Sequence, residues 1–233
     1  MKLREAIILA GGLGTRLRST VPDLPKCMAP VAGKPFISHV IDHFLEGGVE
    51  RFIFALGYKS EHFEDFLRTK LPPEGYGCSV EEEPLGTGGA IRLACTKTTE
   101  RQVLVLNGDT FFGIRTEDLA SFHDRQAAHC SLCLKPMHNF DRYGVVELHP
   151  DHSIRSFREK QFYETGLING GVYALDTLRF LEETLPEKFS FEKDYLETFY
   201  STRPFAGLVQ DEYFIDIGIP EDYERAQNDF ENH

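Results

Sequence analysis

Two aspartates and one lysine are the side chains whose surroundings most directly suggest chemistry. Asp109 follows the apolar run Gln102–Leu106, and Asp216 stands inside the apolar segment Phe214–Ile217. A lone buried carboxylate is costly, whereas carboxylates at strand ends commonly hold hard cations. We therefore expect Asp109 and Asp216 to share one Mg²⁺, although a capping role is an alternative for Asp109. Lys26 lies in a stiff, proline-flanked segment that can hold a cation in place, with an ordinary surface lysine as the alternative.

A glycine-rich loop follows the first apolar run of the chain. The run Ala6–Ala10 predicts a strand buried on both faces, and glycines are frequent between Gly11 and Gly14. Glycines let backbone N–H groups approach a ligand closely, and a helix N-terminus behind them favours negative charge. Thr15 adds a hydroxyl donor and Arg16 a forked cation. The loop therefore predicts a phosphate-binding site, with a tight turn bearing a surface arginine as the alternative.

Two commoner phosphate-binding loops are excluded by particular residues. A dinucleotide-binding fingerprint that starts at Gly12 would need a small residue where Leu17 stands. A P-loop would need a Gly-Lys-Ser/Thr triplet, which the chain lacks. A generic nucleotide-binding dehydrogenase is disfavoured by Leu17 and Arg16 at their positions in this loop.

The overall composition limits the classes of partner. The chain has 233 residues, of which 41% are hydrophobic, so we expect one domain with one sizeable core. A net charge of −12 argues against a nucleic acid or an anionic membrane as partner. The first apolar run is too short for a signal peptide, and free thiols fit the cytoplasm, where we expect the protein to be. Cys130 and Cys133 have the spacing of a zinc pair, but no second pair completes it, and packing in a strand is favoured.

Alternating strand-like and helix-like segments predict an α/β fold with a Rossmann-like, mainly parallel sheet flanked by helices. The expected strands of this part are Ala6–Ala10, Arg51–Leu56, Cys78–Glu82 and Gln102–Leu106, and the expected helices are Phe36–Glu46, Ser60–Leu67 and Gly89–Thr96. Short strands at Cys130–Leu134, Gly144–Leu148, Ser153–Phe157 and Asn169–Leu175 predict a small antiparallel addition. A late strand at Asp211–Ile217 and a closing helix at Pro220–Phe230 complete the expected order.

The loop with Pro25-Lys26 resembles the signature of the sugar-1-phosphate nucleotidyltransferases, and the later blocks of that family recur in its order. These blocks are Glu83–Ala90, Asn107–Asp109, Glu159-Lys160, Asn169–Gly171 and Asp216–Tyr223. The resemblance covers essentially the whole chain and implies a glycosyltransferase-A-like nucleotidyltransferase fold. It also implies a nucleotide-binding part at about 1–115 and a sugar-binding part at about 116–233. Cys27 departs from a proline frequent in the family, which concerns the rigidity of that loop.

The same resemblance implies the reaction. A sugar-1-phosphate oxygen attacks the α-phosphorus of a nucleoside triphosphate, giving a nucleotide-sugar and pyrophosphate. The blocks Phe157–Gln161 and Phe189–Asp194 are similar to the branch that makes GDP-heptose from D-glycero-α-D-manno-heptose 1-phosphate for bacterial surface glycans. The implied partners are thus GTP and a sugar 1-phosphate, with a homo-oligomer left open. Mannose-1-phosphate guanylyl transfer, thymidylyl or uridylyl transfer, and a non-catalytic nucleotide-sugar-binding subunit are the alternatives.

Site residues are carried over from the family position by position. Catalytic roles fall to Arg16, Lys26 and Lys160, with Mg²⁺ held by Asp109 and Asp216. Nucleotide contacts fall to Leu9, Gly11, Gly12, Gly14, Thr15, Arg16, Glu83, Gly86, Thr87 and Gly108. Sugar contacts fall to Tyr143, Gly144, Glu159, Lys160, Asn169 and Gly170. Without the resemblance, Glu159 and Lys160 read as a solvated pair, Gly144 as a strand bulge and Asn169 as a turn residue.

Glu83 is the residue expected to choose the base. An ionised carboxylate only accepts hydrogen bonds, and guanine offers it two adjacent donors, the ring N–H and the amino group. Thymine and uracil offer one N–H between two carbonyls. We therefore expect GTP as donor with Glu83 as selector, and Glu82 if the alignment is displaced by one residue. A solvated strand end is the alternative for this acidic run.

Overall fold

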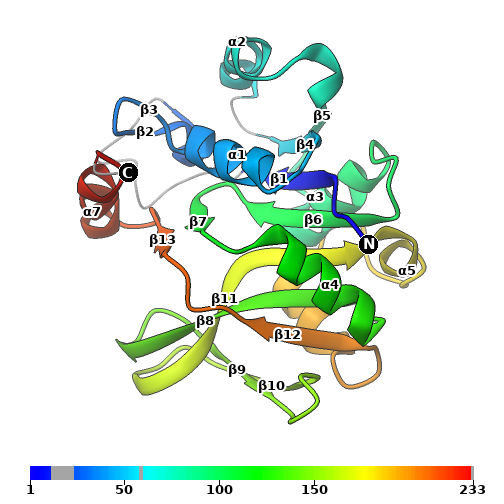
Figure 1. Ribbon diagram of the computed structural model, residues 1–233. Helices are drawn as coiled ribbons and strands as arrows, with labels where there is room; N and C mark the ends of the chain where they lie inside the picture. The colour runs from blue at the N-terminus through cyan, green and yellow to red at the C-terminus, as the bar shows by residue number, and fades with distance from the viewer. Residues whose placement is uncertain (12–23, 58–59, 232–233) are drawn as a thin grey trace.

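A seven-stranded sheet forms the centre of the protein, whose computed structural model describes residues 1–11, 24–57 and 60–231 (Figure 1). In spatial order the strands are β12 (Phe205–Val209), β8 (Cys130–Phe140), β11 (Tyr163–Asp176), β6 (Gln102–Asn107), β1 (Glu5–Leu9), β4 (Arg51–Leu56) and β5 (Tyr76–Val80). Only β11 runs antiparallel to its neighbours β6 and β8, and the other neighbouring pairs are parallel. The predicted fold class is therefore confirmed.

Helices cover both faces of this sheet. They are α1 (Phe36–Glu46), α2 (Glu61–Lys70), α3 (Gly86–Cys95), α4 (Thr116–Gln126), α5 (Thr177–Leu181), α6 (Glu197–Phe199) and α7 (Pro220–Glu231), with the π-helical turn η3 (Phe191–Leu196) and the 3-10 turns η1 (Lys26–Met28) and η2 (Pro73–Gly75). Strand residues alternate between two cores because successive side chains point to opposite faces. In β4, Phe52 and Phe54 pack with α1, and Ile53 and Ala55 pack with α3. None of the described helices is both long and apolar enough to cross a membrane.

Three two-stranded sheets flank the central sheet: β2 (Pro30–Val31) with β3 (Lys34–Pro35), β7 (Thr110–Phe112) with β13 (Phe214–Asp216), and β9 (Val145–Leu148) with β10 (Ile154–Arg158). The predicted late strand Asp211–Ile217 is thus shorter than expected and lies outside the main sheet. Figure 1 shows β13 beside β7, with the chain continuing from β13 into α7.

Two of the four strands predicted for the antiparallel addition, β8 and β11, belong to the main sheet, where they pair antiparallel to each other. β8 and β11 are long strands whose inner halves lie in the main sheet, where β11 pairs with β6, and whose outer halves extend beyond it. Of the four strands predicted for the addition, only β9 and β10 form a sheet of their own. The strands predicted at Cys130–Leu134 and Asn169–Leu175 are the buried halves of β8 and β11. The outer halves were not predicted because they carry polar residues that are at least partly exposed.

Several elements were not predicted. One of them is β12, which pairs with β8 at the edge of the main sheet, and another is α4. The helix predicted at Gly89–Thr96 is present as α3, but it begins three residues earlier, at Gly86. The helix α4 is strongly charged, but its buried positions Thr116, Leu119, Ala120 and His123 follow the three- and four-residue spacing of an amphipathic helix. That spacing is the signal that could have found it.

His123, a buried polar residue of α4, forms hydrogen bonds through both of its ring nitrogens. Its Nδ1 lies 2.8 Å from Ser131 Oγ and its Nε2 2.9 Å from Gln102 Oε1. Because Gln102 Nε2 donates to Asp176, at 3.0 Å, its Oε1 must accept, so we assign the imidazole proton to Nε2. Burial, only partly offset by the charge of Asp176, lowers the pKa of His123 from 6.5 to about 4.

We predict that this histidine makes the protein less stable as the pH falls from 7 to 5. The unfolded chain takes up a proton near pH 6.5, and the folded chain does not until about pH 4. The free energy of unfolding should therefore fall by about 2 kcal/mol over this window. A His123→Gln variant carries no titratable group at this position. Its free energy of unfolding, measured with urea at pH 7 and pH 5, should therefore fall by about 2 kcal/mol less than that of the wild-type protein. Equal losses in both proteins would contradict the prediction.

Candidate active site

Three segments far apart in the sequence meet around one lysine. Lys26 Nζ lies 2.5 Å from Asp109 Oδ2 and 3.2 Å from Asp216 Oδ1. Lys26 opens η1, Asp109 follows β6 in the turn before β7, and Asp216 ends β13. The two aspartates predicted to act as a pair therefore lie together, at the carboxyl end of the parallel strand β6.

Backbone contacts fix the two aspartates relative to each other. Ile217 N–H donates to Asp109 O at 3.1 Å, and Gly218 N–H donates to Asp216 Oδ1 at 2.8 Å. A Cβ atom at Gly218 would lie 2.9 Å from Asp216 Oδ1 and 3.0 Å from Lys26 Nζ. Only glycine leaves room for the ion pair at this position.

The charges at this site do not cancel. Burial by itself lowers the pKa of Lys26, but the charges of Asp109 and Asp216 outweigh it and raise the pKa above its ordinary value. Lys26 is therefore positively charged at neutral pH, facing two carboxylates whose side chains are 37% and 29% exposed. One positive and two negative charges leave a net negative site that fits a further hard cation.

The described residues contain no group of three or more histidine, cysteine or acidic side chains that could hold a metal ion. Asp109 and Asp216 nevertheless offer the oxygen ligands that Mg²⁺ prefers, and Mg²⁺ usually binds through one or two carboxylates plus phosphates and water. The pair thus fits Mg²⁺ only where a phosphate-bearing ligand shares the ion.

Backbone groups at the ends of β1 and β6 frame the same edge of the sheet. Gly108 N–H donates to Leu9 O at 3.0 Å, which places both residues beside Asp109. Gly11 approaches the neighbouring strand end so closely that an added Cβ would lie 2.9 Å from Gly57 N. Gly12, Gly14, Thr15 and Arg16, the rest of the predicted phosphate-binding loop, lie outside the described residues.

The second glycine turn lies between β5 and α3. Glu83 is exposed, and Glu81 Oε2 accepts a hydrogen bond from Leu85 N–H at 2.9 Å. Gly86 has a φ of +74°, and a Cβ there would lie 2.5 Å from Phe189 O. Glu81, which sequence reasoning missed, shapes the turn, whereas the Glu83 side chain forms no hydrogen bond or ion pair with the residues that the structure describes. An acidic residue just before a helix was the available signal.

Thr87 does not offer a free hydroxyl. Its Oγ1 donates to Glu192 Oε2 at 2.9 Å and accepts from Phe191 N–H at 2.8 Å. Its hydroxyl hydrogen is therefore already used, so this hydroxyl could contact a nucleotide only as an acceptor. Glu192 lies in the block Phe189–Asp194 that was singled out from the sequence, but it was given no role, because nothing local signals a partner 105 residues away.

On the predicted sugar side, Tyr143 is the residue that adjoins the aspartates. Its ring packs edge-on against Phe214, with ring centres 6.1 Å apart, and Arg142 Nη2 donates to its Oη at 3.0 Å. Burial and the charge of Asp216 raise the pKa of Tyr143 to about 12, so it stays a neutral phenol. Arg142, which sequence reasoning missed, also forms an ion pair with Asp222 of α7.

The other predicted sugar-side residues divide into two groups. Asn169 Nδ2 donates to Tyr173 Oη at 2.8 Å, and Gly170 packs so closely on Phe112 that a Cβ would lie 2.4 Å from its ring. Glu159 and Lys160 are exposed, and within the described part of the chain their side chains form no hydrogen bond or ion pair.

Gly144 is explained by packing, since a Cβ there would lie 2.4 Å from Arg158 O. Cys130 and Cys133 are both free and buried, and burial raises the pKa of each thiol far above its ordinary value. Packing, the favoured interpretation of the cysteine pair, agrees with this burial.

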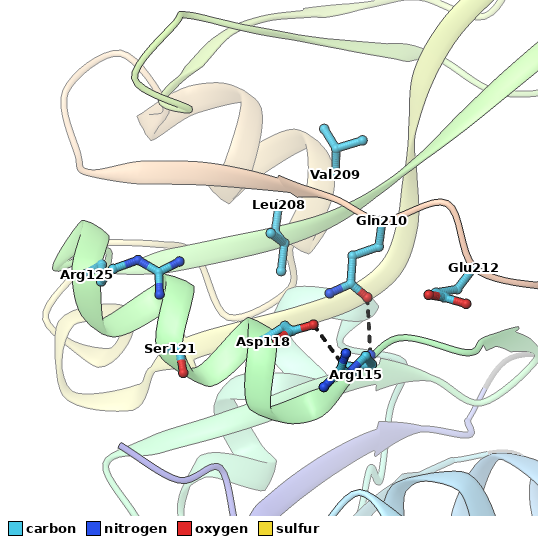
Figure 2. A pocket seen from close by; sticks show the side chains of 8 residues that line it. All are labelled: Arg115, Asp118, Ser121, Arg125, Leu208, Val209, Gln210 and Glu212. Carbon is cyan, nitrogen blue, oxygen red and sulfur yellow. Dashed lines mark hydrogen bonds and ion pairs between the residues drawn. The ribbon is translucent and has the colours of Figure 1, made fainter.

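A separate hollow of about 400 Å³ lies between α4 and the edge strand β12 (Figure 2). Its lining residues are Arg115, Asp118, Ser121, Arg125, Leu208, Val209, Gln210 and Glu212. Arg115 forms an ion pair with Asp118 at 3.5 Å, and its backbone N–H donates to Gln210, as Figure 2 shows. None of the residues predicted from the sequence lines this hollow.

Comparisons with known proteins agree with this geometry. The nucleotidyl transferase family model matches residues 5–233. D-glycero-α-D-manno-heptose 1-phosphate guanylyltransferase of Aneurinibacillus thermoaerophilus is 44% identical over 98% of this chain and 99% of its own length. The Campylobacter jejuni protein of the same name is 43% identical over 94% and 96%.

A solved structure leads to the same family. HddC from Yersinia pseudotuberculosis, in complex with GMP-PN, superposes with a TM-score of 0.87 at 36% identity, covering 98% of this chain and all of HddC. The family model and the two sequence relatives each span nearly the whole chain. The chain therefore belongs to the nucleotidyl transferase family.

Proposed function

We propose that this protein transfers a GMP moiety from GTP to D-glycero-α-D-manno-heptose 1-phosphate, giving GDP-heptose and pyrophosphate. The observation that carries the reaction class is the placement of Lys26 between Asp109 and Asp216 at the carboxyl ends of the strands. The names of the relatives that are 44% and 43% identical support guanine and heptose, and the HddC complex with GMP-PN supports a guanine nucleotide. The proposal includes a cytoplasmic location.

The reaction depends on neutralising the negative charges of the two phosphate-bearing substrates more than on proton transfer. The attacking phosphate oxygen is already an anion at neutral pH, so no general base is needed. Catalysis then depends on positioning and on stabilising the charge that develops on the leaving pyrophosphate. Mg²⁺ held by Asp109 and Asp216 would supply part of that stabilisation. Lys26 would face the triphosphate with Arg16, and Lys160 would face the sugar phosphate.

The remaining roles follow the division of the chain. Residues of about 1–115 would hold the nucleotide, and residues of about 116–233 would hold the sugar. Tyr143, half-buried near Asp216 and kept neutral by its raised pKa, is suited to donate a hydrogen bond to an oxygen of the sugar phosphate or the sugar. Asn169 has one amide hydrogen directed at Tyr173, and its second remains as a donor.

Product analysis with a panel of substrates tests the proposal directly. The purified protein should form GDP-heptose and pyrophosphate from GTP and heptose 1-phosphate, with kcat/KM for GTP about tenfold or more above that for UTP and dTTP. Mannose 1-phosphate should be a poorer acceptor by a modest factor, since a pocket for the larger sugar admits the smaller one. A preference for dTTP or UTP would contradict the base assignment, and equal kcat/KM for the two sugars would remove the heptose assignment.

Replacing Asp109 or Asp216 by Asn should lower kcat by orders of magnitude, because each change removes a charged ligand of the metal. Asn retains the size of the side chain, so both variants should melt cooperatively. Asp211→Asn is the matched control, since Asp211 pairs with Lys135 at 2.7 Å and touches neither aspartate of the site. Near-normal turnover of both site variants in magnesium would show that the metal assignment is wrong.

Replacing Glu83 by Gln should lower kcat/KM for GTP and narrow its advantage over UTP and dTTP. The amide presents one donor where guanine needs an acceptor, and it can pair with thymine or uracil. Glu82→Gln, an exposed neighbour, is the control and should leave the selectivity unchanged. If Glu82→Gln alone narrowed the selectivity, the selector would be Glu82. Unchanged selectivity in both variants would exclude a carboxylate of this pair as the selector.

A further inference from the structure

The segment Phe189–Glu192, here called the buttress segment, packs against the first turn of α3. The amides of Gly88 and Gly89 both donate to Phe189 O, at 3.0 and 3.4 Å, and Phe189 N–H donates to Leu85 O at 2.9 Å. The glycine turn has few side chains with which to fix its own shape. Its backbone is therefore held by the buttress segment from more than 100 residues away.

The side chain of Glu192 completes this contact. Its Oε2 accepts hydrogen bonds from Thr87 Oγ1 at 2.9 Å and from Ser190 Oγ at 3.2 Å. The Thr87 hydroxyl in turn accepts from Phe191 N–H at 2.8 Å, so both its hydrogen and a lone pair are used. Glu192 and Thr87 thus form a closed link between α3 and the buttress segment.

The buttress segment also contacts the predicted sugar side. The Phe191 ring packs edge-on against Tyr173, with ring centres 5.1 Å apart, and Tyr173 Oη accepts from Asn169. Burial raises the pKa of Tyr173, and the charge of Glu192 contributes to the shift. Glu192 therefore lies between the turn that carries Glu83 and the strand that carries Asn169.

The position of Glu83 depends on this arrangement. Its side chain is exposed and, within the described residues, has no hydrogen-bond partner of its own. The chain is anchored two residues later at Leu85, whose N–H donates to Glu81 and whose O accepts from Phe189. Loosening the buttress segment would therefore release Glu83 without touching it.

We propose that Glu192, acting through Thr87, is a positioning residue that holds the turn from Glu83 to Gly89 in the shape that receives the base. The inference rests on the proposed function, since it assigns the base to this turn. It assigns Glu192 no contact with either substrate. Loss of the link should weaken binding of the triphosphate and leave the sugar phosphate almost unaffected.

Paired variants test the link. Thr87→Val and Glu192→Ala each remove it, whereas Thr87→Ser keeps the hydroxyl and Glu192→Gln keeps an acceptor oxygen. The first two should raise KM for the triphosphate that the wild-type protein uses by about five- to tenfold, with KM for the sugar phosphate within about twofold and kcat nearly unchanged. Glu192→Gln should behave as wild type, and Thr87→Ser should keep the hydrogen bond to the Glu192 carboxylate. Glu187→Ala, which removes an exposed carboxylate just before the buttress segment, is the control.

Two further readouts separate positioning from other roles. The double variant Thr87→Val/Glu192→Ala should raise KM for the triphosphate by less than the product of the two single effects, because both single variants remove the hydrogen bond between Thr87 and Glu192. Hydrogen exchange at the amides of Gly88 and Gly89 should speed up in both single variants, whether or not the protein turns over substrate. Unchanged exchange and unchanged KM would overturn the inference.

The remaining outcomes also decide the matter. Two results would mean that the charge of Glu192 contacts a substrate, and either would overturn a positioning role. One is a rise in KM for the triphosphate as large in Glu192→Gln as in Glu192→Ala, and the other is a rise only in KM for the sugar phosphate. If the wild-type protein used no nucleoside triphosphate, the proposed function would fail together with the base-positioning role. In that case, faster exchange in the variants would still establish the link itself.

Discussion

The ion pair of Lys26 with Asp109 and Asp216 is the interaction on which the rest of the site depends. Two carboxylates this close repel each other, and their partial burial strengthens the repulsion. Lys26 relieves it at 2.5 and 3.2 Å, and the backbone of Ile217 and Gly218 holds the carboxylates in place. In a chain with a net charge of −12, a phosphate-bearing ligand must be attracted by a few fixed cations, and this lysine is already in place.

The C-terminal helix braces this arrangement. Asp216 lies outside the main sheet, so β13 and α7 must hold it against the carboxyl end of β6. Tyr223 Oη and Gln227 Nε2 both donate to Pro30 O, at 2.6 and 2.7 Å, which ties α7 to the segment that follows Lys26. The ion pair of Asp222 with Arg142 ties α7 to the loop of Tyr143. One helix thereby sets the distances between groups contributed by three parts of the chain.

The sequence predicted the features that depend on local pattern. The strands β1, β4 and β6 are unbroken apolar runs, and the meeting of Asp109 with Asp216 follows from carboxylates at strand ends. The catalytic, nucleotide and sugar roles stay predictions, since they depend on ligands. What sequence reasoning missed is long-range: β12 is a short edge strand, and Glu192 and Arg142 are ordinary charged residues until their partners fold against them. The outer halves of β8 and β11 carry no strand signal because most of their residues are at least partly exposed, so apolar and polar residues do not alternate there.

The two glycine turns, similar in sequence, must differ in what they can bind. At the start of α3 the amides of Gly88 and Gly89 are already bonded to Phe189 O, so they offer no cradle for a phosphate. The same bonds make the turn rigid, which suits recognition of a flat base by a side chain such as Glu83. In the proposed function, phosphate binding would then fall to Lys26 and to the groups predicted from the first glycine loop and the two aspartates. The proposed function thereby divides charge neutralisation, beside the end of β6, from base recognition, at the start of α3.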